Sequence, residues 1–285
     1  MKTGVVWIER LNIMLNKRHK RRYIILGLAY LSVLFGVRYL IISDFTYLAD
    51  IFSDISRSTS EVSGGLLATV SGGRFIHVRE GMRKEEIGEL FASKLNWSDS
   101  QKLAFLSGPE GRYYPGTYSV SSNKDEEVMR ELMLHRFDRE VETPYASSSE
   151  MIISMPIALK IASLIEREAG GKSDMRLISG IIWNRIFDGM KLDIDATLQY
   201  MKGSARDGWW PVVLSSDKKI DSPYNTYKYR GFPPTPISNP GLASIDAALH
   251  PKKTSCLFYL HDKHRRIHCA TTYKGHVANI KRYLK

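Results

Sequence analysis

From residue 74 onwards, apolar and polar positions follow the periods of short strands and amphipathic helices. The pattern predicts a strand within 74–82, a helix over 84–95, a strand within 113–120 and a helix over 126–137. A strand–helix–strand–helix order of this length encloses only a modest core. We therefore expect residues 74–140 to form a small α/β subdomain.

The rest of the chain carries longer apolar stripes. Helices are predicted over 154–167 and 175–187, and the second ends at a common helix stop, Asp-Gly. The proline-rich stretch 222–241 predicts a long loop, which in a compact domain is usually functional. We therefore expect residues 141–285 to form a mixed α+β domain. Its last predicted elements are a helix over 242–249, a strand over 256–260 and a helix over 275–284.

The first 73 residues show a different pattern. Residues 23–42 form an apolar run in which Arg38 is the only charge, and the run is long enough to span a bilayer. A cleaved signal peptide is the alternative, but no small-residue cleavage site follows the run. Basic residues gather just before it, so the positive-inside rule places the tail, residues 1–22, in the cytoplasm. Residues 43–73 are predicted to form a linker outside the cytoplasm, because their second half is rich in Ser and Gly.

The formal net charge of the chain is +11. Residues 1–22 contain seven Lys or Arg residues and one Glu, so +6 of this charge lies in the tail. A basic tail in this place fits membrane topology better than nucleic-acid binding. The sequence also lacks zinc-ligand spacing, a phosphate-binding loop and any recognisable nucleic-acid-binding module. We therefore expect no nucleic-acid partner, no metal and no other cofactor.

The two cysteines, Cys256 and Cys269, lie on the side that is predicted to be exported. That compartment permits a disulfide bond. Because spacing gives no geometry, a disulfide and two buried free thiols both remain open.

A pair of carboxylates lies at the end of the helix predicted over 154–167. Glu168 continues the apolar stripe of that helix, whereas Glu166 points about 200° away from it. We expect one carboxylate in the apolar interface and the other largely outside it. A carboxyl group on an apolar stripe has a raised pKa, which suits a general acid near neutral pH. The alternative is a structural Glu168 that is neutralised by Arg167 or Arg185.

The loop 222–241 brings together the side-chain types that a sugar-binding site uses. Aromatic rings offer apolar faces for sugars, and Ser and Asn offer hydrogen bonds. Each of these residues is more often structural when taken alone, so only their density indicates a binding site. The aromatic residues are Tyr224, Tyr227, Tyr229 and Phe232, and the polar residues are Ser222, Asn225 and Asn239.

Four blocks of sequence resemble one known family. In order and spacing, IASLIEREAG (161–170), NRIFDGMKLDIDATLQY (184–200), SPYNTYKYRGFPPTPISNPG (222–241) and AALHP (247–251) resemble the YceG-like (MltG) endolytic murein transglycosylases. The resemblance implies an inner-membrane protein with one membrane-spanning helix and an extracytoplasmic catalytic domain. It also implies cleavage within nascent peptidoglycan strands, at the MurNAc–GlcNAc bond, which leaves a 1,6-anhydroMurNAc end and terminates glycan elongation.

The same resemblance implies roles for individual residues. Glu168 falls on the second Glu of the E-[KR]-E motif of the family, so it is implied as the catalytic residue. Asp195 is implied to bind sugar or to shape the site, with a purely structural role as the alternative. Asn184 and Arg185 match a family motif that serves either fold or substrate. The implied glycan-binding residues are Ser222, Asn225, Tyr227, Asp195 and Asn239.

One part of the usual family pattern is not recognised in this sequence. Residues 74–137 resemble the second of two LysM-like halves that family members usually carry, and the first half is missing here. The implied partners are peptidoglycan strands, the membrane and peptidoglycan synthases, without a cofactor. The shortened LysM-like region keeps a second hypothesis open, in which the chain is a non-catalytic peptidoglycan-binding scaffold of the wall synthesis machinery.

Overall fold

The computed structural model describes residues 74–120, 125–146 and 153–284. They lie in one compact unit of the chain, residues 68–285. The cytoplasmic tail, the membrane-spanning helix and the linker lie outside the described residues and stay predictions. Within the described ranges, no helix combines the length and the apolar character that a bilayer crossing needs. These residues form a mixed α+β fold, as predicted, with two small antiparallel sheets.

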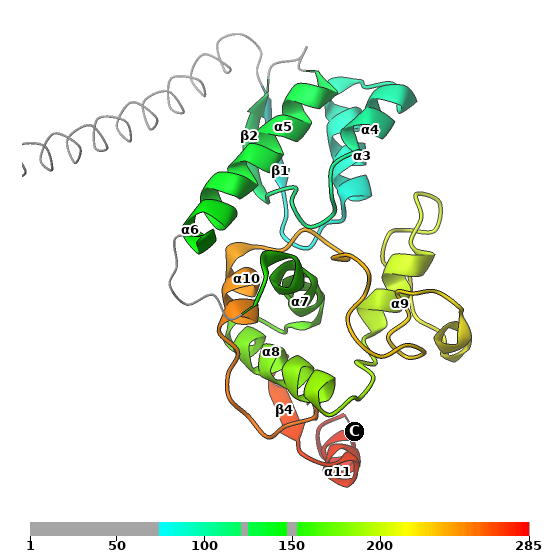
Figure 1. Cartoon of the computed structure of the whole chain (residues 1–285). Coiled ribbons are helices and arrows are strands. Elements are labelled where there is room, and N and C mark those ends of the chain that lie inside the picture. The colour runs from blue at the N-terminus through cyan, green and yellow to red at the C-terminus, as the bar shows by residue number, and fades with distance from the viewer. Residues whose placement is uncertain (1–73, 121–124, 147–152, 285) are drawn as a thin grey trace, which may run out of the picture. The chain divides into compact units, whose positions relative to one another are not determined.

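Residues 74–120 and 125–137 form what we call the small lobe. All of its predicted elements are present, and the structure adds one helix, α4, that the pattern did not predict. α4 buries only Phe105, so it shows no amphipathic repeat. The strands pair antiparallel, with Ile76 opposite Tyr118. In chain order the elements are β1 (Arg74–Val78), α3 (Lys84–Leu95), α4 (Asp99–Phe105), β2 (Gly116–Val120) and α5 (Glu126–Phe137) (Figure 1).

The small lobe has a core of its own. α3 contributes Ile87, Phe91 and Leu95, which are four residues apart and therefore share one face of the helix. The ring of Phe91 lies 5.7 Å from that of Phe105, and both are fully buried. A core built on several large aromatic rings is consistent with an independently packed lobe. Its other buried members include Ile76, Val78, Tyr113, Tyr118, Val120, Met129 and Met133.

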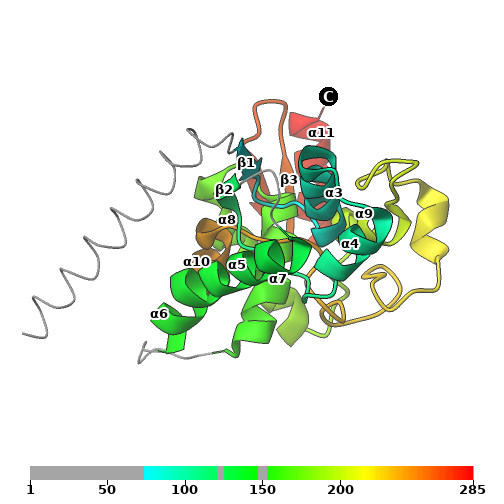
Figure 2. The same cartoon turned by 90° about the horizontal axis from the view of Figure 1, so that it is seen from above.

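Residues 138–146 and 153–284 form the large lobe, which is organised around α7 (Met155–Glu168). A π-helical turn (Asp138–Glu142) and α6 (Thr143–Ala146) lead into it. α7 packs against α10 (Leu242–Leu249) and α8 (Lys172–Phe187), as Figures 1 and 2 show. Its buried face carries Ile161, Leu164 and Ile165, which are fully buried. These three helices agree with the predictions to within three residues at each end.

The region between α8 and the predicted loop 222–241 contains helices that the sequence pattern did not predict. It contains α9 (Asp195–Lys202) and a 3₁₀ helix (Ser215–Lys219). α9 buries three consecutive residues, Ala196, Thr197 and Leu198. A helix of eight residues with such a cluster shows no stripe that periodicity could detect.

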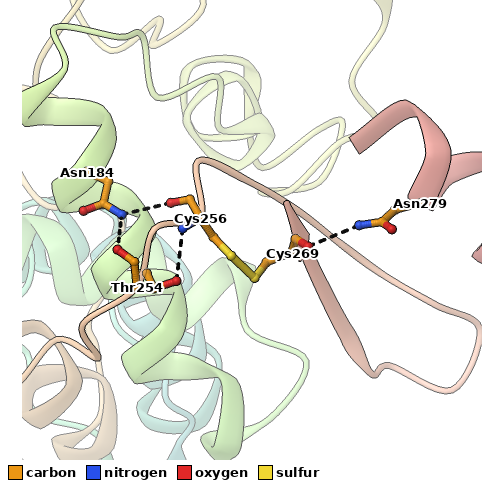
Figure 3. The surroundings of a disulfide bond; sticks show 5 residues. All are labelled: Asn184, Thr254, Cys256, Cys269 and Asn279. Atoms are coloured by element: carbon orange, nitrogen blue, oxygen red, sulfur yellow. Dashed lines mark hydrogen bonds between the residues drawn. A yellow bond between two sulfur atoms is a disulfide. The ribbon is translucent and has the colours of Figure 1, made fainter. Parts of the chain in front are cut away.

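The chain ends in a hairpin and a helix. β3 (Phe258–His261) pairs with β4 (Ile267–Ala270), and α11 (Tyr273–Tyr283) follows. Cys256 and Cys269 form a disulfide bond, which decides between the two states that the sequence left open. Figure 3 shows how neighbouring helices hold this region. Asn184 of α8 donates to the carbonyl oxygens of Thr254 and Cys256, and Asn279 of α11 donates to that of Cys269.

Candidate active site

Glu168 is the last residue of α7, where the chain turns sharply towards α8. Ala169 leaves helical geometry with a ψ of 135°. Gly170 packs so closely that a Cβ atom would lie 2.7 Å from the carbonyl oxygen of Arg265. This turn brings the end of α7 against the β3–β4 hairpin. Glu168 Oε2 accepts a hydrogen bond of 2.6 Å from the hydroxyl of Tyr259 on β3.

The surroundings of Glu168 raise its pKa above the ordinary value of 4.5. Burial of the carboxyl group is the main cause, and the negative charge of Asp195 adds to it. The Tyr259 hydrogen bond, His261 and Arg167 act in the opposite direction. The residue as a whole is only half-buried, so it keeps some contact with solvent. The raised pKa confirms what the apolar stripe predicted.

Neither arginine that was considered as a neutralising partner pairs with Glu168. The guanidinium carbon of Arg167 lies 3.7 Å from the ring centre of Trp210. Arg185 donates to the backbone carbonyl oxygens of Leu257 and Leu192, at 2.6 and 2.7 Å. Arg185 therefore supports the fold, as Asn184 does, and Glu168 has no ion-pair partner in either of them.

Asp195 and Tyr227 form a second pair beside Glu168. Asp195 is the exposed first residue of α9, and its Oδ1 accepts a hydrogen bond of 2.6 Å from the Tyr227 hydroxyl. Burial, Asp195 and the charge of Glu168 all raise the pKa of Tyr227, which therefore stays a hydrogen-bond donor. The Lys218 amine lies 4.3 Å from the centre of the Tyr227 ring. The structure thus brings two predicted site residues, Asp195 and Tyr227, into the electrostatic range of Glu168.

Glu166 lies in different surroundings. Its Oε2 accepts hydrogen bonds from the backbone N–H of Gly241, at 3.0 Å, and from the hydroxyl of Ser244, at 2.5 Å. Gly241 is the N-cap residue of α10 and Ser244 lies in its first turn, so Glu166 satisfies one backbone N–H and one hydroxyl at a helix N-terminus. The prediction that one of the two carboxylates would lie largely outside the apolar interface is wrong, because Glu166 is half-buried as well.

The structure corrects the role predicted for Asn225. Its side chain is fully buried. The amide nitrogen donates to the carbonyl oxygens of Lys218 and Ile220, and the amide oxygen accepts from the N–H of Tyr227. A side chain in this state cannot reach a glycan. Asn225 instead fixes the loop that presents Tyr227.

The glycan-binding role predicted for Asn239 is wrong for the same reason. It is fully buried, and its amide group bonds to the N–H of Tyr113, the carbonyl oxygen of Met82 and the carboxyl of Glu110. All three partners belong to the small lobe. Asn239 therefore joins the proline-rich loop to the small lobe, and its side chain is not available to a ligand.

Ser222 lies apart from the glutamate. It lines an open pocket of about 610 Å³ together with Lys160, Phe232 and neighbouring prolines. Glu168, Asp195, Tyr227 and Tyr259 do not line this pocket. Lys160 is eight residues before Glu168 on α7, which is about 12 Å along a helix. Ser222 is thus not grouped with Glu168, Asp195 and Tyr227, although its carbonyl oxygen accepts a hydrogen bond from the N–H of Asn225 at 2.9 Å.

Sequence reasoning missed Tyr259 and His261. Both lie on β3, and His261 Nε2 is 3.1 Å from Asp174 Oδ2 on α8. The sequence predicted only a strand over 256–260, which includes Tyr259 but not His261. No local signal indicates that this strand meets the end of α7, about 90 residues earlier. Among the described residues, no three His, Cys, Asp or Glu side chains are grouped as metal ligands would be.

Comparison with known proteins agrees with the sequence blocks. The model of the YceG-like family matches residues 47–282. A Bacillus subtilis protein named endolytic murein transglycosylase is 36% identical over 61% of this chain and 48% of its own length. A Streptococcus pneumoniae protein of the same name is 28% identical over 60% of this chain and 31% of its own length. The chain thus matches about half or less of these relatives.

A solved structure supports the same relationship. The crystal structure of a yceG-like protein from Listeria monocytogenes matches 72% of this chain and 75% of its own, with a TM-score of 0.65 and 25% identity. The extent of the family match and the shared fold lead to one conclusion. The chain belongs to the YceG-like family.

Proposed function

We propose that this protein is an endolytic murein transglycosylase that cleaves peptidoglycan strands with Glu168 as its acid and base. The observation that carries the proposal is a single half-buried carboxyl group with a raised pKa, beside a second carboxylate and two tyrosines. The names of the relatives support it. A group that must first donate and then accept a proton works best when its pKa lies near the working pH.

In the first step, neutral Glu168 gives its proton to the glycosidic oxygen while the bond from that oxygen to C1 of MurNAc breaks. Positive charge develops at C1, as in other glycosidic cleavages. The carboxylate left on Glu168 then accepts the proton of the MurNAc 6-hydroxyl, whose oxygen bonds to C1. No water is consumed, so the product carries a 1,6-anhydro ring and the reaction is that of a lyase.

Asp195 supplies negative charge near the reacting centre. Its position is fixed by the hydrogen bond from Tyr227, so the charge is already in place when C1 becomes positive. The same charge helps to keep Glu168 protonated before the reaction. Asp195 and Tyr227 remain our proposed glycan-binding residues. Ser222 belongs to a separate pocket, which would contact the glycan only farther from the cleaved bond.

The placement of the enzyme is part of the proposal. We infer a cytoplasmic tail (1–22), one membrane-spanning helix (23–42), a linker (43–73), a LysM-like subdomain (74–140) and a catalytic domain (141–285) outside the cytoplasm. The apolar run and the basic cluster before it support this order. In this arrangement the enzyme acts on strands that leave a synthase and terminates their elongation. Its partners would be the glycan strands, the membrane and peptidoglycan synthases.

Mass analysis of reaction products tests the proposal. The full chain in detergent is incubated with purified peptidoglycan strands, and the ends of the released fragments are identified. We expect 1,6-anhydroMurNAc ends from the parent protein and none from a Glu168→Gln variant. Reducing ends would indicate a hydrolase instead. Glycan binding without any cleavage would favour a non-catalytic scaffold.

A further inference from the structure

The neighbour that touches the carboxylate of Glu168 is a tyrosine that the proposed reaction does not use. The Tyr259 hydroxyl donates to Glu168 Oε2 at 2.6 Å. The Tyr259 ring is half-buried and packs against the core of the large lobe. It belongs to β3, directly opposite Cys269 of β4. A hydroxyl held in this way is aimed at the carboxylate before any substrate arrives.

Helix α8 holds strand β3, which carries Tyr259, near both ends of the strand. His261, two residues farther along β3, contacts Asp174 of α8 at 3.1 Å. Just before the start of β3, Arg185 of α8 donates to the carbonyl oxygen of Leu257 at 2.6 Å. The disulfide joins Cys256 to the residue that faces Tyr259 across the sheet. Figure 3 shows this disulfide beside α8 and α11. The strand that carries Tyr259 is therefore held rigidly, and a precise contact to a reacting group requires such support.

We propose that Tyr259 is a positioning residue, whose hydroxyl holds Glu168 Oε2 and leaves Oε1 to carry the proton that is transferred. This inference rests on the proposed function. A carboxylic acid has one proton, and an oxygen that accepts a hydrogen bond from a phenol is the less favourable place for it. The phenol keeps its own proton throughout, because burial and the Glu168 carboxylate raise the pKa of Tyr259 well above its ordinary value.

The Tyr259 hydroxyl also stabilises the ionised form of Glu168. Four other charged or titratable groups face this carboxyl: Asp195 from α9, His261 from β3, Arg167 from α7 and Tyr227 from the loop. Asp195 raises the pKa of Glu168, and His261 and Arg167 lower it. Because Tyr259 donates directly to the carboxylate, removal of its hydroxyl should raise the pKa further and free the Glu168 side chain to change rotamer.

A Tyr259→Phe variant tests the inference, because it removes the hydroxyl and keeps the ring. Cleavage needs protonated Glu168, so activity falls as the pH rises through the pKa of Glu168. In the variant we expect this fall about one pH unit higher. We also expect kcat to drop about tenfold and KM to stay within about twofold, since the glycan contacts are intact. Tyr273→Phe is the matched control, because Tyr273 lies on α11 and is 67% exposed.

A second measurement does not depend on activity. The Glu168 carboxyl of the full chain in detergent is titrated by carbon NMR in the parent, the Tyr259→Phe variant and the Tyr273→Phe control. A higher pKa in the Tyr259→Phe variant alone supports the inference. An unchanged Glu168 pKa overturns it. A parent protein without lytic activity would contradict the proposed function, while this titration would still decide the role of Tyr259.

Discussion

The last turn of α7 carries two glutamates in different surroundings. On one side, Glu166 faces the start of α10 and receives hydrogen bonds from Gly241 and Ser244. On the other side, Glu168 faces the hairpin and α9, with Tyr259 as its donor and Asp195 as a charged neighbour. Burial raises the pKa of Glu168, whereas the Glu166 carboxylate has two donors at a helix N-terminus.

The different surroundings of Glu166 and Glu168 distinguish a structural carboxylate from a reactive one on the same helix. Glu166 accepts hydrogen bonds from groups that would otherwise be unpaired, so it stabilises the fold. Burial raises the pKa of Glu168, so this carboxyl group holds its proton at higher pH than an ordinary glutamate and can act as a general acid. Substitutions on the two sides should therefore separate loss of activity from loss of stability.

The largest expected effect is on activity. Replacing Glu168 by Gln removes the group that gives and accepts the proton, so the rate of strand cleavage should fall by about 10³-fold or more. Replacing Glu166 by Gln keeps an acceptor oxygen for Gly241 and should reduce the rate by less than about tenfold. Initial rates of release of anhydro ends measure both. Equal losses of cleavage rate in the Glu168→Gln and Glu166→Gln variants would contradict the different roles assigned to these two carboxylates.

An Asp195→Asn variant should lower the rate by about 10- to 100-fold, because the charge that stabilises C1 is lost while the acceptor for Tyr227 remains. Since the charge of Asp195 raises the pKa of Glu168, the variant should also move the alkaline fall of activity to lower pH. This shift is opposite in sign to the one expected for Tyr259→Phe. A pH–rate profile measures both effects, and an unchanged profile would contradict the electrostatic role of Asp195.

On the structural side, Glu166→Ala should lower the free energy of unfolding by about 1–3 kcal/mol. The reason is that the N–H of Gly241 and the hydroxyl of Ser244, both of them buried residues, lose their acceptor. Chemical denaturation of the full chain in detergent measures the change. Glu127→Ala is a suitable control, because Glu127 is exposed and forms a surface ion pair with Arg130, which contributes little. A Glu166→Ala variant as stable as this control would contradict the role of Glu166.

The smallest expected effect is a gain in stability when Glu168 is replaced by Gln. The pKa of Glu168 is higher in the folded state than in the unfolded state, so the folded state binds this proton more tightly. Well below pH 4.5, the ordinary pKa of a glutamate, both states hold the proton and no stability is lost. As the pH rises, the unfolded state ionises first and the fold loses stability. Glu168→Gln should therefore be more stable than the parent at pH 7, and the difference should become small at pH 4. Thermal melts at both pH values measure this difference.

Much of the fold follows from local periodicity. The five amphipathic helices α3, α5, α7, α8 and α10 show apolar spacing that one face of a helix explains. The position of Glu168 on such a stripe also predicted its raised pKa. By contrast, α4 and α9 have only seven and eight residues, which is too short for a helical period to be recognised in the sequence.

The site was harder to predict, because it depends on contacts between distant segments. Tyr259 meets Glu168 across 91 positions, which no local pattern encodes. Asn225 and Asn239 have the right chemistry for sugar binding, but a buried loop needs polar side chains to satisfy its own backbone groups. A loop of this kind therefore shows the same residue types whether they bind a ligand or support the fold.

The most direct test compares the parent, Glu166→Gln and Glu168→Gln proteins in one assay of anhydro-ended products from the same peptidoglycan strands. Circular dichroism of each sample first establishes that all three are folded. Our account predicts abundant anhydro ends from the parent and the Glu166→Gln variant, and none above background from Glu168→Gln. Anhydro ends from Glu168→Gln at the parental rate would contradict the assignment of Glu168 as the catalytic residue.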